Sequence, residues 1–235
     1  MANKFPVVLF LTICLMVAGS AAGQKKLKSW KEWSKSDAQK ILNDSPWAHL
    51  QIDQDFVEAT PLTRPTDSSI DSRLKQNEGM TYGIRFFSAR PIRQAFVRMI
   101  QLQKKDLAPD MTSRLNTFAE VASEDSIIIA VTIENPDANM LGKAMQIVRN
   151  ATTATLKNST YLERNDGKRI FLAQYTPPGS DGFGARSIFP RMLDDKPFLS
   201  TEISNVRFVS DLGSSIKLNM TYKVNDMMVD GKLEF

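Results

Sequence analysis

The chain has 235 residues, of which 30 are basic and 26 acidic, with one histidine and one cysteine. This length suffices for one large domain or two small ones with a substantial core, and the composition is ordinary for a globular protein. The formal net charge of +4 is too small to indicate nucleic acid as a partner. A single histidine also excludes a metal site built from several histidines.

The first 23 residues have the pattern of an export signal. Lys4 provides a positive start, residues 5–17 form a short apolar core, and small residues lead to Gly23. Because about 20 apolar residues are needed to span a bilayer, we expect cleavage and no transmembrane span afterwards. Cleavage also removes Cys14, so we expect no disulfides. Cysteine-free chains suit an oxidising periplasm, and we expect an exported protein, periplasmic or secreted, with the bacterial cell envelope favoured.

Residues 24–79 are expected to form an N-terminal helix followed by a polar linker. The helix is predicted over 34–42, capped by Ser34 or Ser36 and stopped before Pro46. Trp30, Trp33 and Trp47 bracket this helix, and we expect them to pin it onto the main domain. Residues 53–77 show no sustained periodicity, which indicates a loop or linker.

Residues 80–235 are expected to form an α+β domain. Strands are predicted over 80–87 and 126–133 from their β-favouring residues, and amphipathic helices over 91–105 and 138–148 from their apolar spacing. Residues 118–121 are ambiguous. The remaining predicted strands cover 151–156, 160–164, 168–175, 185–189, 202–209, 215–224 and 227–235, with a tight turn at 165–167.

The fold class that follows is α+β, with an N-terminal helix, a mixed or antiparallel sheet, two amphipathic helices and a strand-rich C-terminal half. Several segments resemble a group of exported bacterial proteins that has no established function. They are WKEW at 30–33, KILNDSPWA at 40–48, SARPIRQA at 88–95, IFPR at 188–191 and DMMVDGKLE at 226–234. The resemblance spans nearly the whole mature chain and implies one continuous unit, but it implies no activity, cofactor or catalytic residue.

Four arginines run from the second predicted strand into the helix that follows, namely Arg85, Arg90, Arg93 and Arg98. Arg90 and Arg93 flank Pro91 near a helix start, where backbone N–H groups favour anions. This cluster and the three tryptophans are the candidate binding residues. The alternative, which the pattern favours for the arginines, is ordinary ion pairing or coverage of apolar surface by their stems.

No other motif indicates a catalytic, metal or cofactor site. His49 is interpreted as a helix-flanking polar residue rather than a base, because no nucleophile or orienting group is evident. The glycines from Gly179 to Gly184 lack dinucleotide-binding spacing and indicate a connection between strands. The carboxylates lack calcium-loop spacing, so a catalytic acid pair would have to be assembled by the fold.

The leading functional hypothesis is a non-enzymatic binding or interaction protein of the cell envelope. Its partner would be an envelope protein that contacts the tryptophan segment or the arginine helix. One alternative is an envelope hydrolase that uses two carboxylates in a cleft between the helices and the C-terminal sheet. Another is a carrier of a small apolar ligand.

Overall fold

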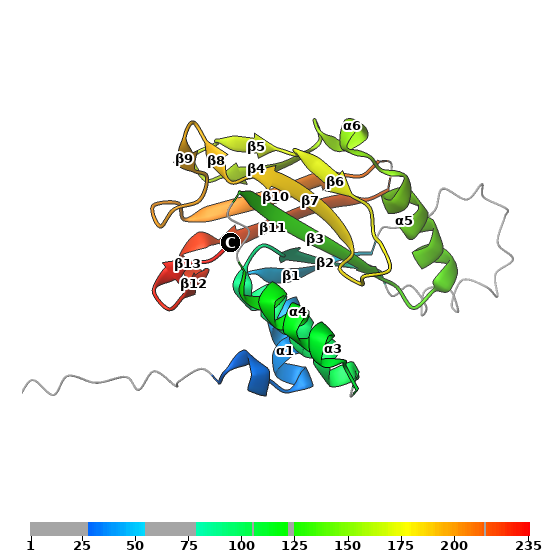
Figure 1. The fold of residues 1–235 in the computed structure, drawn as a ribbon. Coiled ribbons are helices and arrows are strands. Elements are labelled where there is room, and N and C mark those ends of the chain that lie inside the picture. Colours follow the sequence, from blue (N-terminus) through cyan, green and yellow to red (C-terminus); the bar gives the residue numbers. More distant parts are fainter. Residues whose placement is uncertain (1–27, 55–78, 105, 122–124, 214) are drawn as a thin grey trace, which may run out of the picture.

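The computed structural model describes residues 28–54, 79–104, 106–121, 125–213 and 215–235. The predicted export signal and nearly all of the predicted linker lie outside these residues. The strands of the described chain form antiparallel sheets, and helices cover part of them (Figure 1). The predicted α+β class with a strand-rich C-terminal half is confirmed. None of the described helices is long and apolar enough to traverse a bilayer.

The larger sheet has five strands in the order β1-β2-β3-β7-β6. They are β1 (Ala48–Asp53), β2 (Met80–Phe86), β3 (Ser126–Glu134), β7 (Ala185–Pro190) and β6 (Gln174–Thr176). The β-branched run of β3 forms the central strand, pairing with β2 on one side and β7 on the other. Its apolar sequence reflects cover on both faces, as the pattern predicts.

The second sheet has four strands in the order β11-β10-β4-β5. They are β11 (Lys217–Lys223), β10 (Asn205–Asp211), β4 (Thr160–Arg164) and β5 (Arg169–Phe171). The predicted tight turn joins β4 to β5, with Gly167 at a φ of 82°. The single strand predicted over 168–175 is wrong, because the chain passes between sheets there: Leu172 N bonds to Thr160 O and Ala173 N to Ile188 O.

The two sheets pack face to face around an aromatic core. The ring centroids of Phe86 and Tyr222 lie 4.8 Å apart, and those of Phe189 and Phe208 lie 6.3 Å apart. The Tyr222 hydroxyl also donates a 2.8 Å hydrogen bond to the carbonyl of Ile84 in the opposite sheet. Alternating inward-facing side chains from both sheets therefore build one continuous core.

A glutamine side chain joins the two sheets along one edge. Gln51 on β1 donates through Nε2 to the carbonyl of Lys217 at 2.8 Å, and its Oε1 accepts from the Asn219 N–H at 2.9 Å. The backbones of β1 and β11 are not paired with each other. The Gln51 amide instead makes the two hydrogen bonds to β11 that the backbone of a neighbouring strand would make.

Three helices group beside the larger sheet: α1 (Lys35–Asn43), α3 (Arg90–Gln103) and α4 (Pro109–Glu120) (Figure 1). Ser34 and Asp37 form a capping box that starts α1, which confirms one of the two predicted caps. α5 (Ala138–Asn150) begins at the Asp137 cap and packs on β3. The helices predicted over 91–105 and 138–148 are confirmed as α3 and α5, with small shifts at their ends.

The remaining elements are short. They are the 3-10 turns η1 (Trp30–Glu32) and η2 (Val224–Asp226), the hairpins β8 (Met192–Leu193) with β9 (Lys196–Pro197) and β12 (Met228–Val229) with β13 (Lys232–Leu233), and α6 (Thr153–Leu156). The predicted strand over 151–156 is wrong, because Thr152 and Thr155 cap each other reciprocally and start α6.

Candidate functional site

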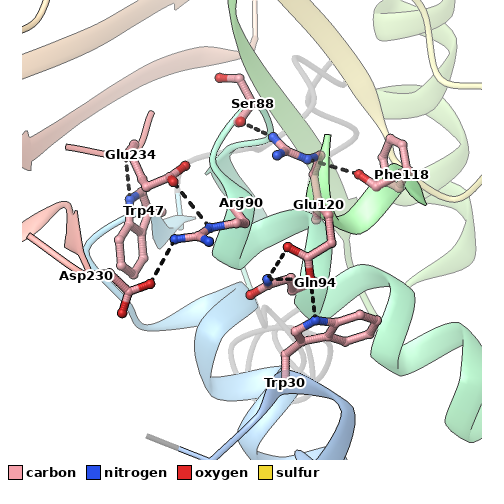
Figure 2. Close-up of polar contacts among 10 residues, drawn as sticks. Trp30, Trp47, Ser88, Arg90, Gln94, Phe118, Glu120, Asp230 and Glu234 are labelled. Atoms are coloured by element: carbon pink, nitrogen blue, oxygen red, sulfur yellow. Dashed lines mark hydrogen bonds and ion pairs between the residues drawn. The ribbon is translucent and has the colours of Figure 1, made fainter. Parts of the chain in front are cut away.

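The tryptophans anchor the N-terminal segment to other parts of the fold. The indole of Trp30 donates a 2.7 Å hydrogen bond to Glu120 on α4, and that of Trp47 donates one of the same length to the carbonyl of Glu234 (Figure 2). Both residues are only 7% exposed. Trp33 is more accessible and donates to the Lys28 carbonyl at 3.2 Å. The predicted pinning role is confirmed for Trp30 and Trp47, whereas the indole of Trp33 bonds within the N-terminal segment itself.

The four candidate arginines point in different directions and form no common site. Arg90 reaches the C-terminal hairpin, where its Nη2 lies 3.2 Å from Asp230 and its Nε lies 3.2 Å from Glu234 (Figure 2). The Nε contact is an ion pair without hydrogen-bond alignment. Arg98 instead donates through Nε to the Trp33 carbonyl at 2.6 Å and fastens the N-terminal segment to α3.

Arg93 is buried between α3 and α4. Its Nη1 bonds to the carbonyl of Ser88, and its Nε donates to the carbonyl of Phe118 at 3.2 Å. Its Nη2 is buried and has no hydrogen-bond partner within the described part of the chain. Burial lowers the pKa of Arg93, although an arginine side chain stays charged in proteins. Arg93 thus ties two helix ends to each other.

Arg85 differs from the others because its guanidinium lies under α1 and bonds to neutral acceptors. Its Nε donates to the carbonyl of Leu42 at 2.5 Å, its Nη1 to the Thr132 hydroxyl at 2.6 Å, and its Nη2 to Asn43 Oδ1 at 2.8 Å. No carboxylate of the described residues lies within ion-pair distance, and Arg85 is only 5% exposed. Burial accordingly lowers the pKa of Arg85.

The glycine two residues before Arg85 leaves room for this guanidinium. A Cβ atom built on Gly83 would lie 2.5 Å from Nη2 of Arg85, closer than carbon and nitrogen can approach. The guanidinium therefore lies directly across the backbone of β2, level with Thr132, the residue that pairs with Gly83 on β3. Its hydrogen-bond acceptors therefore fix the Arg85 guanidinium in place, and the absence of a side chain at Gly83 provides the space that it occupies.

The guanidinium lines a cavity of about 320 Å³ between α1, α3 and the outer face of the larger sheet. Leu42, Phe96, Met99, Ile100 and Phe183 contribute apolar surface, and Gln39, Asn43, Arg85, Gln103, Thr132, Glu134 and Asp181 contribute polar groups. This volume lies at the small end of the range for ligand pockets, which are apolar sites with a few placed polar groups.

The glycine-rich segment between β6 and β7 forms one wall of the cavity. Phe183 packs against Phe87 and Phe96, with ring centroids 4.9 and 5.4 Å apart. Gly184 follows at a φ of 81°, and a Cβ there would lie 2.2 Å from the Val131 carbonyl. The segment connects two strands, as the sequence predicts, and it also places an aromatic ring over the cavity.

The acidic groups of the cavity differ in their partners. Asp181 pairs with Arg186 at 2.7 Å. The carboxylate of Glu134 makes no ion pair or hydrogen bond with any residue that the structure describes, and its side chain is exposed. Glu134 and Arg85 therefore border the same cavity as opposite charges that do not touch each other.

The single histidine lies elsewhere. His49 is on β1 rather than beside a helix, and its ring is 4.9 Å from that of Tyr222 in the sandwich core. It does not line the cavity. Across the described ranges, no group of three or more histidine, cysteine, aspartate or glutamate side chains is arranged to hold a metal. The cavity is lined by charged, polar and apolar side chains.

Sequence reasoning selected Arg85 but missed the rest of the cavity, including Glu134, Thr132 and Met99. One local signal was present: an arginine in an otherwise apolar strand, two residues after a glycine. Comparisons with family models, curated proteins and solved structures find no match.

Proposed function

We propose that this chain is an exported, non-enzymatic binding protein that holds a small ligand in the cavity beside Arg85. The N-terminal signal pattern supports export, and the cavity supports ligand binding. The observation that carries the proposal is the Arg85 guanidinium, which is buried, borders a cavity and faces no carboxylate within ion-pair distance among the described residues.

Burial of a charge that has no ion-pair partner in contact is costly, because the charge loses its hydration. Part of that cost is offset structurally, since Arg85 bonds to the last residues of α1 and a cation is stabilised at the C-terminal end of a helix. The same guanidinium still reaches the cavity. A ligand with an acceptor group next to an apolar part would complement both the guanidinium and the walls.

The contacts of the other candidate residues favour the cavity over a protein-docking surface. Trp30 and Trp47 are buried and hydrogen-bonded within the chain, and Arg90 is paired with Asp230 and Glu234. A partner that used these groups would have to displace existing contacts. The hydrolase alternative needs two available carboxylates, and one of the two that line the cavity is already paired with Arg186.

The test uses four compounds with the same branched apolar end: L-leucine with both charges, 4-methylpentanoate with the carboxylate alone, 3-methylbutylamine with the ammonium alone, and the uncharged 3-methylbutan-1-ol. A second set replaces the isobutyl end by benzyl. Binding is measured as a shift in melting temperature of the folded chain. A ligand at ten times its Kd stabilises the fold by about 1.4 kcal/mol, which raises the melting temperature of a chain of this size by roughly 3–6 °C.

Met99→Trp fills the cavity, and Met192→Trp is the matched control at an exposed position outside it. We expect at least one compound to stabilise the wild type and Met192→Trp but not Met99→Trp. Calorimetric titration of both variants, with circular dichroism as the check on folding, confirms the loss. The proposal is wrong if no compound binds, or if Met99→Trp binds as tightly as the control.

A further inference from the structure

Opposite charges border the cavity without neutralising each other. Arg85 donates only to uncharged acceptors, and Glu134 has no polar partner among the described residues. Both residues come from the outer face of the same sheet. A surface that keeps a cation and an anion apart in one pocket is complementary to a molecule that carries both charges.

The strand register gives an approximate distance between the charged groups of Arg85 and Glu134. The guanidinium lies over Gly83 and bonds to Thr132, its partner across the sheet. Glu134 is two residues further along β3 on the same face, which corresponds to about 7 Å at the strand rise of about 3.3 Å per residue. A carboxylate and an ammonium borne by one carbon, each with a charge-assisted hydrogen bond of about 2.8 Å, span a gap of this size.

The apolar part of the cavity lining lies opposite the charged groups of Arg85 and Glu134. Phe96, Met99 and Ile100 come from one face of α3, and Phe183 comes from the glycine-rich segment. A side chain on the charge-bearing carbon would lie against this wall, where about 25 cal/mol is gained per Å² of apolar surface removed from water. The cavity of about 320 Å³ is large enough for one such group and too small for a long chain.

We infer that the ligand is a free α-amino acid with an apolar side chain, with its carboxylate on Arg85 and its ammonium on Glu134. This inference rests on the proposed function, because it assigns the ligand class of the same cavity. It goes further in requiring that both charges of the ligand be recognised at once.

The test compares affinities within the matched compounds by calorimetric titration. L-leucine or L-phenylalanine should bind at least about tenfold more tightly than the analogue that lacks its ammonium and the analogue that lacks its carboxylate, on the scale of one hydrogen bond to a charged group. N-acetyl-leucine and leucinamide, which each lose one charge but keep the side chain, should show the same loss.

Glu134→Gln keeps the size of the side chain and removes its charge. We expect this variant to bind L-leucine about tenfold more weakly and to bind 4-methylpentanoate at least as tightly as the wild type does. Glu202→Gln is the matched control, an exposed glutamate that does not line the cavity. It should leave both affinities unchanged.

The possible results separate this inference from the proposed function. If 4-methylpentanoate or 3-methylbutylamine binds as tightly as L-leucine, the amino-acid assignment is overturned and the binding function stands. If L-leucine is preferred but Glu134→Gln does not reduce that preference, the role of Glu134 is overturned. If none of the compounds binds, both proposals fail.

Discussion

The indole Nε1 of Trp47 donates a 2.7 Å hydrogen bond to the backbone carbonyl of Glu234, a residue 187 positions later in the sequence. This contact joins the turn between α1 and β1 to the C-terminal hairpin. Arg90 lies beside it and pairs with the Glu234 side chain. The backbone and the side chain of one glutamate therefore hold two separate parts of the N-terminal half.

Trp47→Phe removes the donor and keeps most of the apolar ring. The carbonyl of Glu234 then loses its partner in a partly buried position, so we expect a loss of about 1–3 kcal/mol in the free energy of unfolding. Trp33→Phe is the control, because its indole donates a longer bond, 3.2 Å, in an exposed position. Urea titrations should show the larger loss for Trp47→Phe, and equal losses would contradict this account.

Gly184→Ala should destabilise the fold more than Gly167→Ala. Both glycines have φ near +80°, where an added Cβ costs about 1–2 kcal/mol in either case. At Gly167 the Cβ would meet no atom within 4 Å, whereas at Gly184 it would lie 2.2 Å from the Val131 carbonyl. The melting temperatures of the two variants measure the difference. A smaller loss for Gly184→Ala than for Gly167→Ala would show that the backbone of β3 moves to accommodate the added methyl group.

His49 should titrate below its ordinary pKa of about 6.5. Burial lowers the pKa of this ring, and the nearby carboxylate of Asp44 opposes the shift. Because the chain has one histidine, its imidazole gives a single set of NMR signals, and their pH dependence measures the pKa directly. Asp44→Asn should lower the pKa further.

The lowered pKa of His49 also predicts how the free energy of unfolding depends on pH. The folded-state pKa of His49 lies below the unfolded value, so the stability it confers is complete above about pH 6.5 and declines as the pH falls toward the folded pKa. His49→Gln should flatten the dependence between pH 7 and the folded pKa. An unchanged slope would mean that the ring is accessible in the fold.

Glu163 should contribute to stability only above mildly acidic pH. Hydrogen bonds from Arg207 and Arg169 lower the pKa of its carboxyl group. The stabilisation is therefore present above the unfolded pKa of about 4.3 and is lost as the pH falls through the lower folded value. The difference in melting temperature between the wild type and Glu163→Gln should shrink from pH 6 to pH 3. A small difference is expected throughout, because the network is solvent-accessible.

The elements that sequence predicted correctly are those with a strong local signal. Ser34 with Asp37 starts α1, Pro91 lies in the first turn of α3, and the β-branched run of β3 matches a central strand. Each signal is contained within one segment. Local propensity and periodicity therefore sufficed for these elements without knowledge of the tertiary structure.

The elements that were missed carry weaker or misleading patterns. β1 does alternate apolar and polar residues, but its apolar Leu50 and Ile52 are 44% and 62% exposed while Gln51 is turned toward the other sheet. α4 has Met111, Leu115 and Phe118 at helical spacing within an otherwise polar segment. Threonines favour strands by propensity, yet at Thr152 reciprocal capping outweighs that preference.

The candidate site was predictable only in part, because it is assembled from five separate segments. Arg85 and Arg90 are five residues apart, but the chain turns from β2 into α3 between them. The Arg85 side chain bonds to the end of α1, whereas the Arg90 side chain pairs with the C-terminal hairpin. Nothing local connects Arg85 to Glu134, which lies 49 positions later. Their proximity depends on the register of β2 with β3, which the sequence does not reveal.

The Gln51 amide has a consequence for how copies of this chain meet one another. Unpaired strand edges invite pairing between molecules. Among the strands that the structure describes, β1 lies at the edge of its sheet and carries the exposed Leu50 and Ile52. Gln51 bonds to the carbonyl of Lys217 and the N–H of Asn219, and it thereby covers part of the edge of β11. One side chain thus covers two backbone groups that a strand of a second molecule would otherwise pair with.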